Sequence, residues 1–363
     1  SLEPGGQVEL SAGPVSNIHQ AKAQLDEFFF QLKTIASSIG GISFITVGIH
    51  PFSKTEDIEW VPKRRYEIMS RYLIQKGRRA HDMMKRTCTN QINLDYENEE
   101  DAIETMRLAF RITPIAAAMF AHSGFANGKP SSFIAERLNI WRFTDPERSG
   151  LAIGLACEHC KFEDYLDYVL DVPVMFIVRG SEWIVTNDLT FRRFIKKGYQ
   201  GIQPTRSDFE LHLSTIFTEA RFKQYLEVRG IDCQRVHLIP AVFAFWKGIL
   251  YDSQARQKAK NAVRHLKDEQ LFKLHQDVEK LGLTAKVRGA SVLELAEQLV
   301  KISGEGLARQ NDRNEQGLDE RIYLAPLWED VLKRSQTPAE EPNELWKGQL
   351  QRNPKAFVDN FTI

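Results

Sequence analysis

Three short stretches of the sequence place carboxylate, amide or guanidinium groups at alternating positions. QVELS carries Glu9, NQINLDY carries Gln91 and Asn93, and YLEVR carries Glu227 and Arg229. Alternate residues of an extended strand point to the same face, so each stretch predicts a strand with one polar face. Oxygen ligands suit Mg²⁺ or Mn²⁺, and a guanidinium suits a phosphate. If the three strands share one antiparallel sheet, they form a metal-phosphate site; solvated strand faces are the alternative.

The hydrophobic pattern predicts the elements that would position these groups. Apolar residues at three-to-four spacing predict helices at 17–38, 63–84, 98–121, 161–173, 190–198 and 208–217. Alternation or short apolar runs predict strands at 7–11, 42–52, 86–96 and 174–178, and again within 220–232. From residue 236 onward the pattern is helical almost to the end. We therefore expect an α+β fold with one domain, residues 1–363, whose sheet-bearing part (1–252) packs against a helical part (253–363).

Composition excludes several classes of function. The 363 residues contain 48 Lys plus Arg and 48 Asp plus Glu, so no net positive field favours nucleic acid or an anionic membrane surface. The most apolar stretches, such as 112–121, are much shorter than a bilayer span. We expect a globular protein with small-molecule partners, neither a nucleic-acid-binding nor a membrane protein.

The cysteines indicate a reducing compartment. Four cysteines are too few and too scattered to cross-link a chain of this length. Cys157 and Cys160 have a spacing that a metal or a disulfide could use, but no second ligand pair lies nearby in the sequence. Two ordinary thiols are therefore the favoured interpretation, and we expect a cytoplasmic protein.

Six blocks carry a family resemblance. They read SLEPGGQVELSAGP, RRYEIMSRYL, DMMKRTCTNQINLDY, GKPSSFIAERLNIWRFTD, DYLDYVLDVPVMFIVR and LSTIFTEARFKQYLEVRGID. In this order they resemble the blocks of plant- and proteobacterial-type glutamate-cysteine ligases, or γ-glutamylcysteine synthetases. The resemblance implies a fold like the glutamine synthetase catalytic domain, with an antiparallel sheet curled into a funnel. Family members have a further acidic strand before SLEPGG, so it also implies that the printed chain is truncated at its N-terminus.

The resemblance implies an ATP-dependent amide-bond formation, the first step of glutathione biosynthesis. The γ-carboxylate of L-glutamate attacks the γ-phosphate of ATP, and the amine of L-cysteine then displaces phosphate from γ-glutamyl phosphate. Such chemistry depends on positioning and on neutralising phosphate charge, with no protein nucleophile. The alternatives are a ligase that joins glutamate to another amine, and an inactive fragment or interaction module. The sequence leaves open whether the enzyme is a monomer or a homodimer.

The resemblance assigns the metal and nucleotide residues by block. Glu9 and Glu227 correspond to metal ligands, and Glu3 is a weaker candidate beside them. Oxygen-only ligands of this kind suit Mg²⁺ or Mn²⁺. Gln91 and Asn93 are expected to line the nucleotide-metal part of the funnel; for Asn93 an amide ladder between strands is an equal alternative.

The resemblance also assigns arginines and a substrate pocket. Arg229 matches a phosphate-facing arginine, although an ion pair with Glu227 or Glu219 inside the sheet is the alternative. Arg137 matches an arginine that holds glutamate or the transferred phosphate, because its planar fork suits both groups. Trp141 is expected either to wall the same pocket or to be plain core. By block position, the candidates for the cysteine site are Tyr66, Tyr72 and Arg86.

Overall fold

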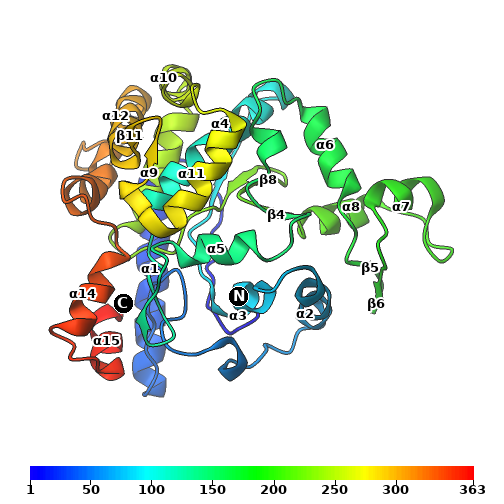
Figure 1. Ribbon diagram of the computed structural model, residues 1–363, viewed down its shortest axis with the longest axis horizontal. Coiled ribbons are helices and arrows are strands. Elements are labelled where there is room, and N and C mark those ends of the chain that lie inside the picture. Colours follow the sequence, from blue (N-terminus) through cyan, green and yellow to red (C-terminus); the bar gives the residue numbers. More distant parts are fainter.

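The computed structural model describes residues 1–363 and has a mixed α+β architecture of many helices and several small sheets. In Figure 1, α9–α12 gather at the upper left, α2 and α3 lie below the centre, and α6–α8 extend to the right. The helices are α1 (Ile18–Ile39), α2 (Arg64–Lys76), α3 (Ala80–Arg86), α4 (Glu99–Met119), α5 (Glu136–Arg142), α6 (Phe162–Asp171), α7 (Phe191–Lys197), α8 (Arg206–Leu213), α9 (Ile239–Leu250), α10 (Ser253–Val263), α11 (Asp268–Leu281), α12 (Val292–Gln310), α13 (Ala325–Leu327), α14 (Glu340–Lys347) and α15 (Pro354–Phe361).

The largest sheet has three antiparallel strands in the order β1 (Ile92–Leu94), β9 (Leu226–Val228) and β8 (Ala220–Phe222). The register places Asn93 opposite Glu227, and Glu227 opposite Arg221. Because side chains alternate along a strand, these three polar residues form one row on one face. The residues on either side of them in each strand are apolar and face the protein interior.

Helices α4 and α9 pack against the apolar face of this sheet. The oxygen of the Asn98 side chain caps the start of α4 by accepting from the backbone N–H of Asp101 at 3.0 Å. Pro114 lies inside α4, which continues to Met119. The sheet and these helices share a core of 60 buried residues that reaches into the C-terminal helices, so the polar face rests on a large packed support.

The C-terminal helices pack closely on α9. A Cβ atom at Gly306 of α12 would overlap the carbonyl oxygen of Gly248 in α9, so only glycine permits this helix crossing. The hairpin β10 (Lys286–Val287) and β11 (Ala290–Ser291) precedes α12, and Ser291 caps that helix together with Glu294. The division into parts 1–252 and 253–363 remains a prediction.

Two short pairings bring distant segments beside the main sheet. The parallel pair β4 (Ser149–Gly150) and β7 (Phe217–Thr218) places residue 150 next to the start of the β8–β9 hairpin. The backbone N–H of Glu219 donates to Gly150 at 3.0 Å, and the N–H of Arg229 donates to Glu219 at 2.8 Å. The pair β2 (Phe125–Ala126) and β3 (Lys129–Pro130) lies beside α14.

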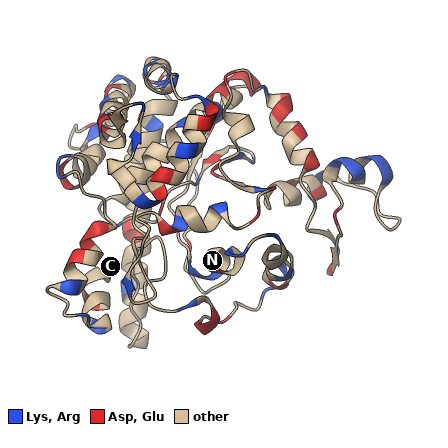
Figure 2. Cartoon of the chain, in the orientation of Figure 1, with Lys and Arg blue, Asp and Glu red and all other residues tan.

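The arm at the right of Figure 1 is held by charge pairs as well as packing. It contains α6–α8 and the antiparallel hairpin β5 (Phe176–Arg179) and β6 (Glu182–Val185). Figure 2 shows that α7 is rich in basic residues and α6 in acidic ones, whereas both signs are interspersed over most other helices. Arg192 of α7 binds Asp167 at 2.8 Å and Asp171 at 2.6 Å, which joins the two helices.

Several predicted elements differ in the structure. The stretch 7–11 is no strand of the main sheet; Val8 forms an isolated bridge with Leu2. The apolar run 42–52 is not a continuous strand, because its backbone bonds to loops: the N–H of Gly48 donates to His122 at 2.9 Å, and that of His50 to Arg86 at 2.7 Å. The predicted helix 63–84 is two helices, since α2 ends at Gly77. The stretch 86–96 contains only the short strand β1, and 220–232 contains the β8–β9 hairpin.

Candidate active site

Glu227 lies at the centre of the polar face and is surrounded by cations. Its carboxylate is 1% exposed. It accepts from Nε and Nη2 of Arg221 at 2.9 and 3.0 Å and from Nη1 of Arg229 at 3.0 Å, and Nζ of Lys223 lies 3.1 Å away. Burial alone raises the pKa of such a carboxylate, but Arg229 and Arg221 outweigh it and lower the pKa of Glu227 to about 2. Glu227 is therefore ionised and fully paired.

Arg221 is a residue that the sequence analysis did not single out. It is 5% exposed, and besides Glu227 it binds backbone carbonyls of the segment that leads into the hairpin, including that of Ile216 at 2.5 Å. Asn93 is exposed on the same row, and Gln91 is half-buried two residues before it. The predicted common face of Asn93, Glu227 and Arg229 is thus present, with Arg221 as a further member.

Glu9 and Glu3 lie in the N-terminal turn, outside the sheet. The turn is bound to the rest of the protein through Gln7, whose Nε2 donates to the carbonyls of Met84 and Thr87, both at 3.2 Å. Glu9 is exposed, yet desolvation and the charge of Glu3 raise the pKa of its carboxyl, with a smaller contribution from Glu227. The carboxylates of Glu3 and Glu9 have no salt-bridge partner. The N-terminal ammonium and Arg229 oppose this rise in pKa without contacting the carboxylate, and two neighbouring acidic groups without a direct ion pair suit a divalent ion.

The structure fits only part of the predicted metal-ligand set. No group of three His, Cys, Asp or Glu side chains is arranged to hold a metal ion. The oxygens of Glu227 already accept from Arg221 and Arg229, so this arrangement leaves it no lone pair directed at a metal. Glu3 and Glu9 fit a cation better, because neither forms a direct salt bridge and their mutual repulsion is only partly offset by the N-terminal ammonium and Arg229. The cysteines are all free thiols, as expected for Cys157 and Cys160.

Arg137, Trp141 and Arg229 come together at a small cavity. Nη2 of Arg137, on α5, donates to the carbonyl of Arg229 at 3.1 Å. The guanidinium carbons of Arg137 and Arg229 lie 5.5 and 5.2 Å from the ring centre of Trp141, within cation–π range. The cavity that they line with Glu219 and Phe217 has a volume of about 10 Å³, room for one water molecule. Arg137 therefore lies beside Arg229, and its role in holding glutamate or phosphate remains a prediction.

Three polar atoms at this cavity have no hydrogen-bond partner. They are Nε of Arg137, Nε1 of Trp141 and one carboxylate oxygen, Oε2, of Glu219. Each such buried atom costs about 1–3 kcal/mol in the folded protein when nothing binds it. Burial also lowers the pKa of Arg137, although Asp232 and Glu219 oppose this effect. Two donors and an acceptor without partners, on residues that line one cavity, could bind a water molecule or another small polar group.

The three residues predicted for the cysteine site form hydrogen bonds with different partners and do not contact one another through these bonds. The hydroxyl of Tyr66 donates to the carbonyl of Leu2 at 3.1 Å, and burial with the charge of Glu3 raises the pKa of Tyr66 to about 12. The hydroxyl of Tyr72 accepts from Arg148 at 2.9 Å, beside the fully buried pair of Arg148 and Asp145.

Arg86 has mainly structural partners. Its guanidinium donates to Asp82 at 3.0 Å and to Asn127 at 2.9 Å, and its Nε has no partner. These bonds join α3 to the β2–β3 turn. Of the three residues, Tyr66 thus lies beside a predicted metal ligand, Glu3, while Tyr72 and Arg86 bind other side chains.

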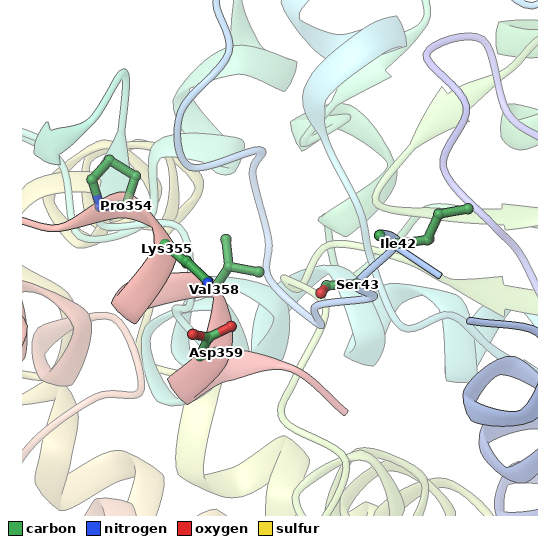
Figure 3. Close-up of a pocket in the computed structure, with 7 residues that line it drawn as sticks. Ile42, Ser43, Pro354, Lys355, Val358 and Asp359 are labelled. Atoms are coloured by element: carbon green, nitrogen blue, oxygen red, sulfur yellow. The ribbon is translucent and has the colours of Figure 1, made fainter. Parts of the chain in front are cut away.

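A wider hollow on the surface lies elsewhere. It has a volume of about 440 Å³ and lies between residues 41–43, after α1, and helix α15. Figure 3 shows Lys355, Val358 and Asp359 of α15 on one side of this hollow, with Ser43 and Ile42 on the other. None of the predicted site residues lines this hollow. We therefore place the candidate site at the smaller cavity, where the charged and unpartnered polar groups lie.

Around this small cavity lie buried arginines beside a carboxylate, and guanidinium groups of this kind bind carboxylate and phosphate oxygens. A family model described as glutamate-cysteine ligase family 2 (GCS2) matches residues 1–355, and the chain belongs to this family. It is 38% identical to the chloroplastic glutamate–cysteine ligase of Medicago truncatula over 364 residues. This alignment covers 99% of the chain and 70% of the relative.

Two further plant relatives agree. The chloroplastic glutamate–cysteine ligase of Solanum lycopersicum is 39% identical over 351 residues, which are 96% of this chain and 66% of the relative. That of Arabidopsis thaliana is 37% identical over 352 residues, with the same 96% and 66% coverage. The chain therefore spans about two thirds of the length of these relatives. No helix in the structure has both the length and the apolar character needed to cross a membrane.

Proposed function

We propose that this protein is an ATP-dependent ligase that joins the γ-carboxylate of L-glutamate to the amine of L-cysteine through γ-glutamyl phosphate, the first step of glutathione biosynthesis. Family membership along nearly the whole chain supports the reaction class. The observation that carries the proposal is the convergence of Arg137, Arg221 and Arg229 around Glu227 and Trp141, because the reaction transfers a phosphoryl group between anions.

We extend the proposal to the shape of the catalytic fold. The row Asn93–Glu227–Arg221 would form part of the polar inner wall of a glutamine synthetase-like funnel, backed by α4 and α9. Residues 1–252 would supply this wall and residues 253–363 would support it, within one catalytic domain. What favours this arrangement is the sharp contrast between the polar and apolar faces of the three-stranded sheet.

The chain's own residues would act by binding and orienting. Arg229 and Arg137 would hold phosphate or carboxylate oxygens, with Trp141 as a flat wall between them. Glu3 and Glu9 would hold a cation, Mg²⁺ or Mn²⁺, which when bound supplies positive charge to the phosphates of ATP. Gln91 and Asn93 would face the nucleotide. Glu227 would join Glu3 and Glu9 as a ligand of the cation once a phosphate or carboxylate of a substrate binds Arg221 or Arg229 and frees one of its oxygens.

The cysteine site and the setting of the enzyme complete the proposal. Tyr66, Tyr72 and Arg86 remain the candidates for cysteine binding, with Tyr66 favoured by its place beside Glu3. We propose a monomer or a homodimer. We also propose a cytoplasmic location because all four cysteines are free thiols; the relatives' names contain "chloroplastic", which makes an organelle the alternative.

Phosphate release from ATP tests the proposal. The protein is incubated with ATP, Mg²⁺ and L-glutamate, with L-cysteine or with one of a panel of other amines. Release that needs both glutamate and cysteine, with formation of γ-glutamylcysteine, is expected. Release with glutamate and a different amine would support the alternative ligase, and no release with any amine would support an inactive fragment or interaction module.

A further inference from the structure

A buried acidic residue outside the predicted set borders the same cavity. Glu219 follows β7 and is 4% exposed. Its Oε1 lies 2.5 Å from Nε2 of His275, whereas its Oε2 has no hydrogen-bond partner. A carboxylate with one oxygen fixed and the other unpartnered is an acceptor held ready for a donor that the protein does not supply.

His275 fixes the position of this carboxylate. It belongs to α11 and is 1% exposed. Burial lowers the pKa of an imidazole, but the charge of Glu219 and the hydrogen bond to it outweigh burial, so the pKa of His275 is raised. The imidazole therefore donates to Glu219 Oε1. Since α11 also packs against α4 and α5, the carboxylate is held by a rigid element.

The charges around the cavity match an amino acid. Arg137 and Arg229 present guanidinium groups, and Glu219 presents a carboxylate oxygen, within one small set of lining residues. An α-amino acid carries the complementary charges, a carboxylate and an ammonium. The cavity volume of about 10 Å³ suits an ammonium group, which is about as large as a water molecule. If the pair of Glu219 and His275 served only to join β7 to α11, the second oxygen of Glu219 would have no reason to lack a hydrogen-bond partner.

We propose that the free carboxylate oxygen of Glu219 binds the α-ammonium group of an amino-acid substrate, and that His275 is the positioning residue that holds it there. This inference rests on the proposed function. Both amino acids of the proposed reaction carry an α-ammonium group, and in cysteine this group is also the reacting amine once it has lost a proton. The separate kinetic constants of the two amino acids distinguish them.

The test is Glu219→Gln in the complete chain. The KM for glutamate or the KM for cysteine is expected to rise at least about tenfold, because the amide loses the charge that pairs with the ammonium. The KM for ATP and the Mg²⁺ concentration for half-maximal rate should stay unchanged. A rise in the glutamate constant identifies glutamate's ammonium as the ligand, and a rise in the cysteine constant identifies cysteine's. No change in either, or a change in Mg²⁺ requirement alone, overturns the inference.

Direct binding separates this inference from the proposed function. Calorimetry compares L-glutamate with glutarate, which lacks the ammonium, and L-cysteine with 3-mercaptopropionate. The parent is expected to prefer one amino acid over its analogue, and Glu219→Gln should abolish that preference. If the parent shows this preference without ligase activity, the proposed function fails and the ammonium site stands. If the parent shows no preference for either amino acid over its analogue, the ammonium site is wrong.

Two further variants exclude a purely structural effect. His275→Gln should raise the same KM as Glu219→Gln, by a smaller factor, because the carboxylate remains but is no longer fixed. Glu279→Gln is the matched control: Glu279 is equally buried, but both of its oxygens are partnered by Arg142 and Asn139. It should lower the melting temperature and leave the ratio of the two amino-acid KM values unchanged. An equal change in that ratio for Glu279→Gln would overturn the inference.

Discussion

Arg221 and Glu227 face each other across neighbouring antiparallel strands and share a two-point hydrogen bond, Nε to Oε2 at 2.9 Å and Nη2 to Oε1 at 3.0 Å. The planar guanidinium matches the carboxylate in the same way that it matches a phosphate. Arg229 adds a third donor from the same strand as Glu227. Glu227 therefore occupies the donors of both arginines that a phosphate or carboxylate of a substrate would otherwise use.

Replacing Glu227 by Gln should destabilise the protein by about 3 kcal/mol or more, because it leaves buried cations without their partner. Urea unfolding measures this difference. The pH dependence should change too. The folded pKa of about 2 is below the ordinary 4.5, so the stabilisation from Glu227 is complete above pH 4.5 and is lost as the pH falls toward 2. The variant should lose less stability than the parent across this range; equal losses would show that Glu227 is not strongly paired.

Replacing Arg137 by Lys should reduce turnover by at least about tenfold, since lysine keeps the charge but loses the planar fork. The steady-state rate of phosphate release measures this effect. Arg206→Lys is the matched control, because the Arg206 side chain is 89% exposed and pairs only with Glu210. Unchanged kinetics for Arg137→Lys would remove Arg137 from the site.

Replacing Gly5 by Ala should displace the turn that carries Glu3 and Glu9. A Cβ atom at residue 5 would overlap the backbone of Lys85 at the end of α3, and backbone atoms cannot move aside easily. We expect reduced activity and a raised Mg²⁺ requirement, with little change in the global unfolding of the core. Gly13→Ala is the control, because nothing lies within 4 Å of its Cβ position. If both variants behave alike, the contact with Lys85 does not hold the turn.

Replacing Glu9 by Gln should raise the Mg²⁺ concentration for half-maximal rate by about tenfold, because one of the two carboxylates proposed to hold the cation is lost. Burial and the repulsion from Glu3 raise the pKa of Glu9, and both disfavour its charged form, so the uncharged variant should not be less stable than the parent. Glu163→Gln, an exposed change on α6, controls for general loss of charge. A Mg²⁺ titration that is identical for Glu9→Gln and the parent would exclude Glu9 as a ligand.

The sequence was sufficient to predict which residues share a strand face. Within one strand the period of two fixes which side chains share a face, whereas the pairing of Asn93 with Glu227 depends on the register between β1 and β9. Most helices were also predictable, since their apolar faces repeat every three to four residues. The run 42–52 was mistaken for a strand because apolar residues are equally compatible with a buried irregular segment, and only tertiary hydrogen bonds decide between them.

The partners within the site were harder to predict. Arg221 was missed because the turn after Phe222 interrupts the alternation, and register does not appear in one strand's pattern. Glu219 and His275 are 56 residues apart, on a loop and a helix, so no local spacing joins them. The ion pairing of Glu227 was considered only as an alternative for Arg229. Partner identity depends on packing across the whole core, which periodicity does not encode.

The two acidic residues Glu227 and Glu9 belong to segments that differ in local stability. Glu227 lies on a strand that belongs to the 60-residue core, whereas Glu9 lies on a turn attached by a few backbone and amide hydrogen bonds. Local opening of the turn therefore requires much less free energy than opening of the sheet. Amide hydrogens of residues 3–9 should exchange with solvent long before those of β9. As denaturant is added, catalysis should disappear at a concentration at which the spectrum of the folded core is still intact.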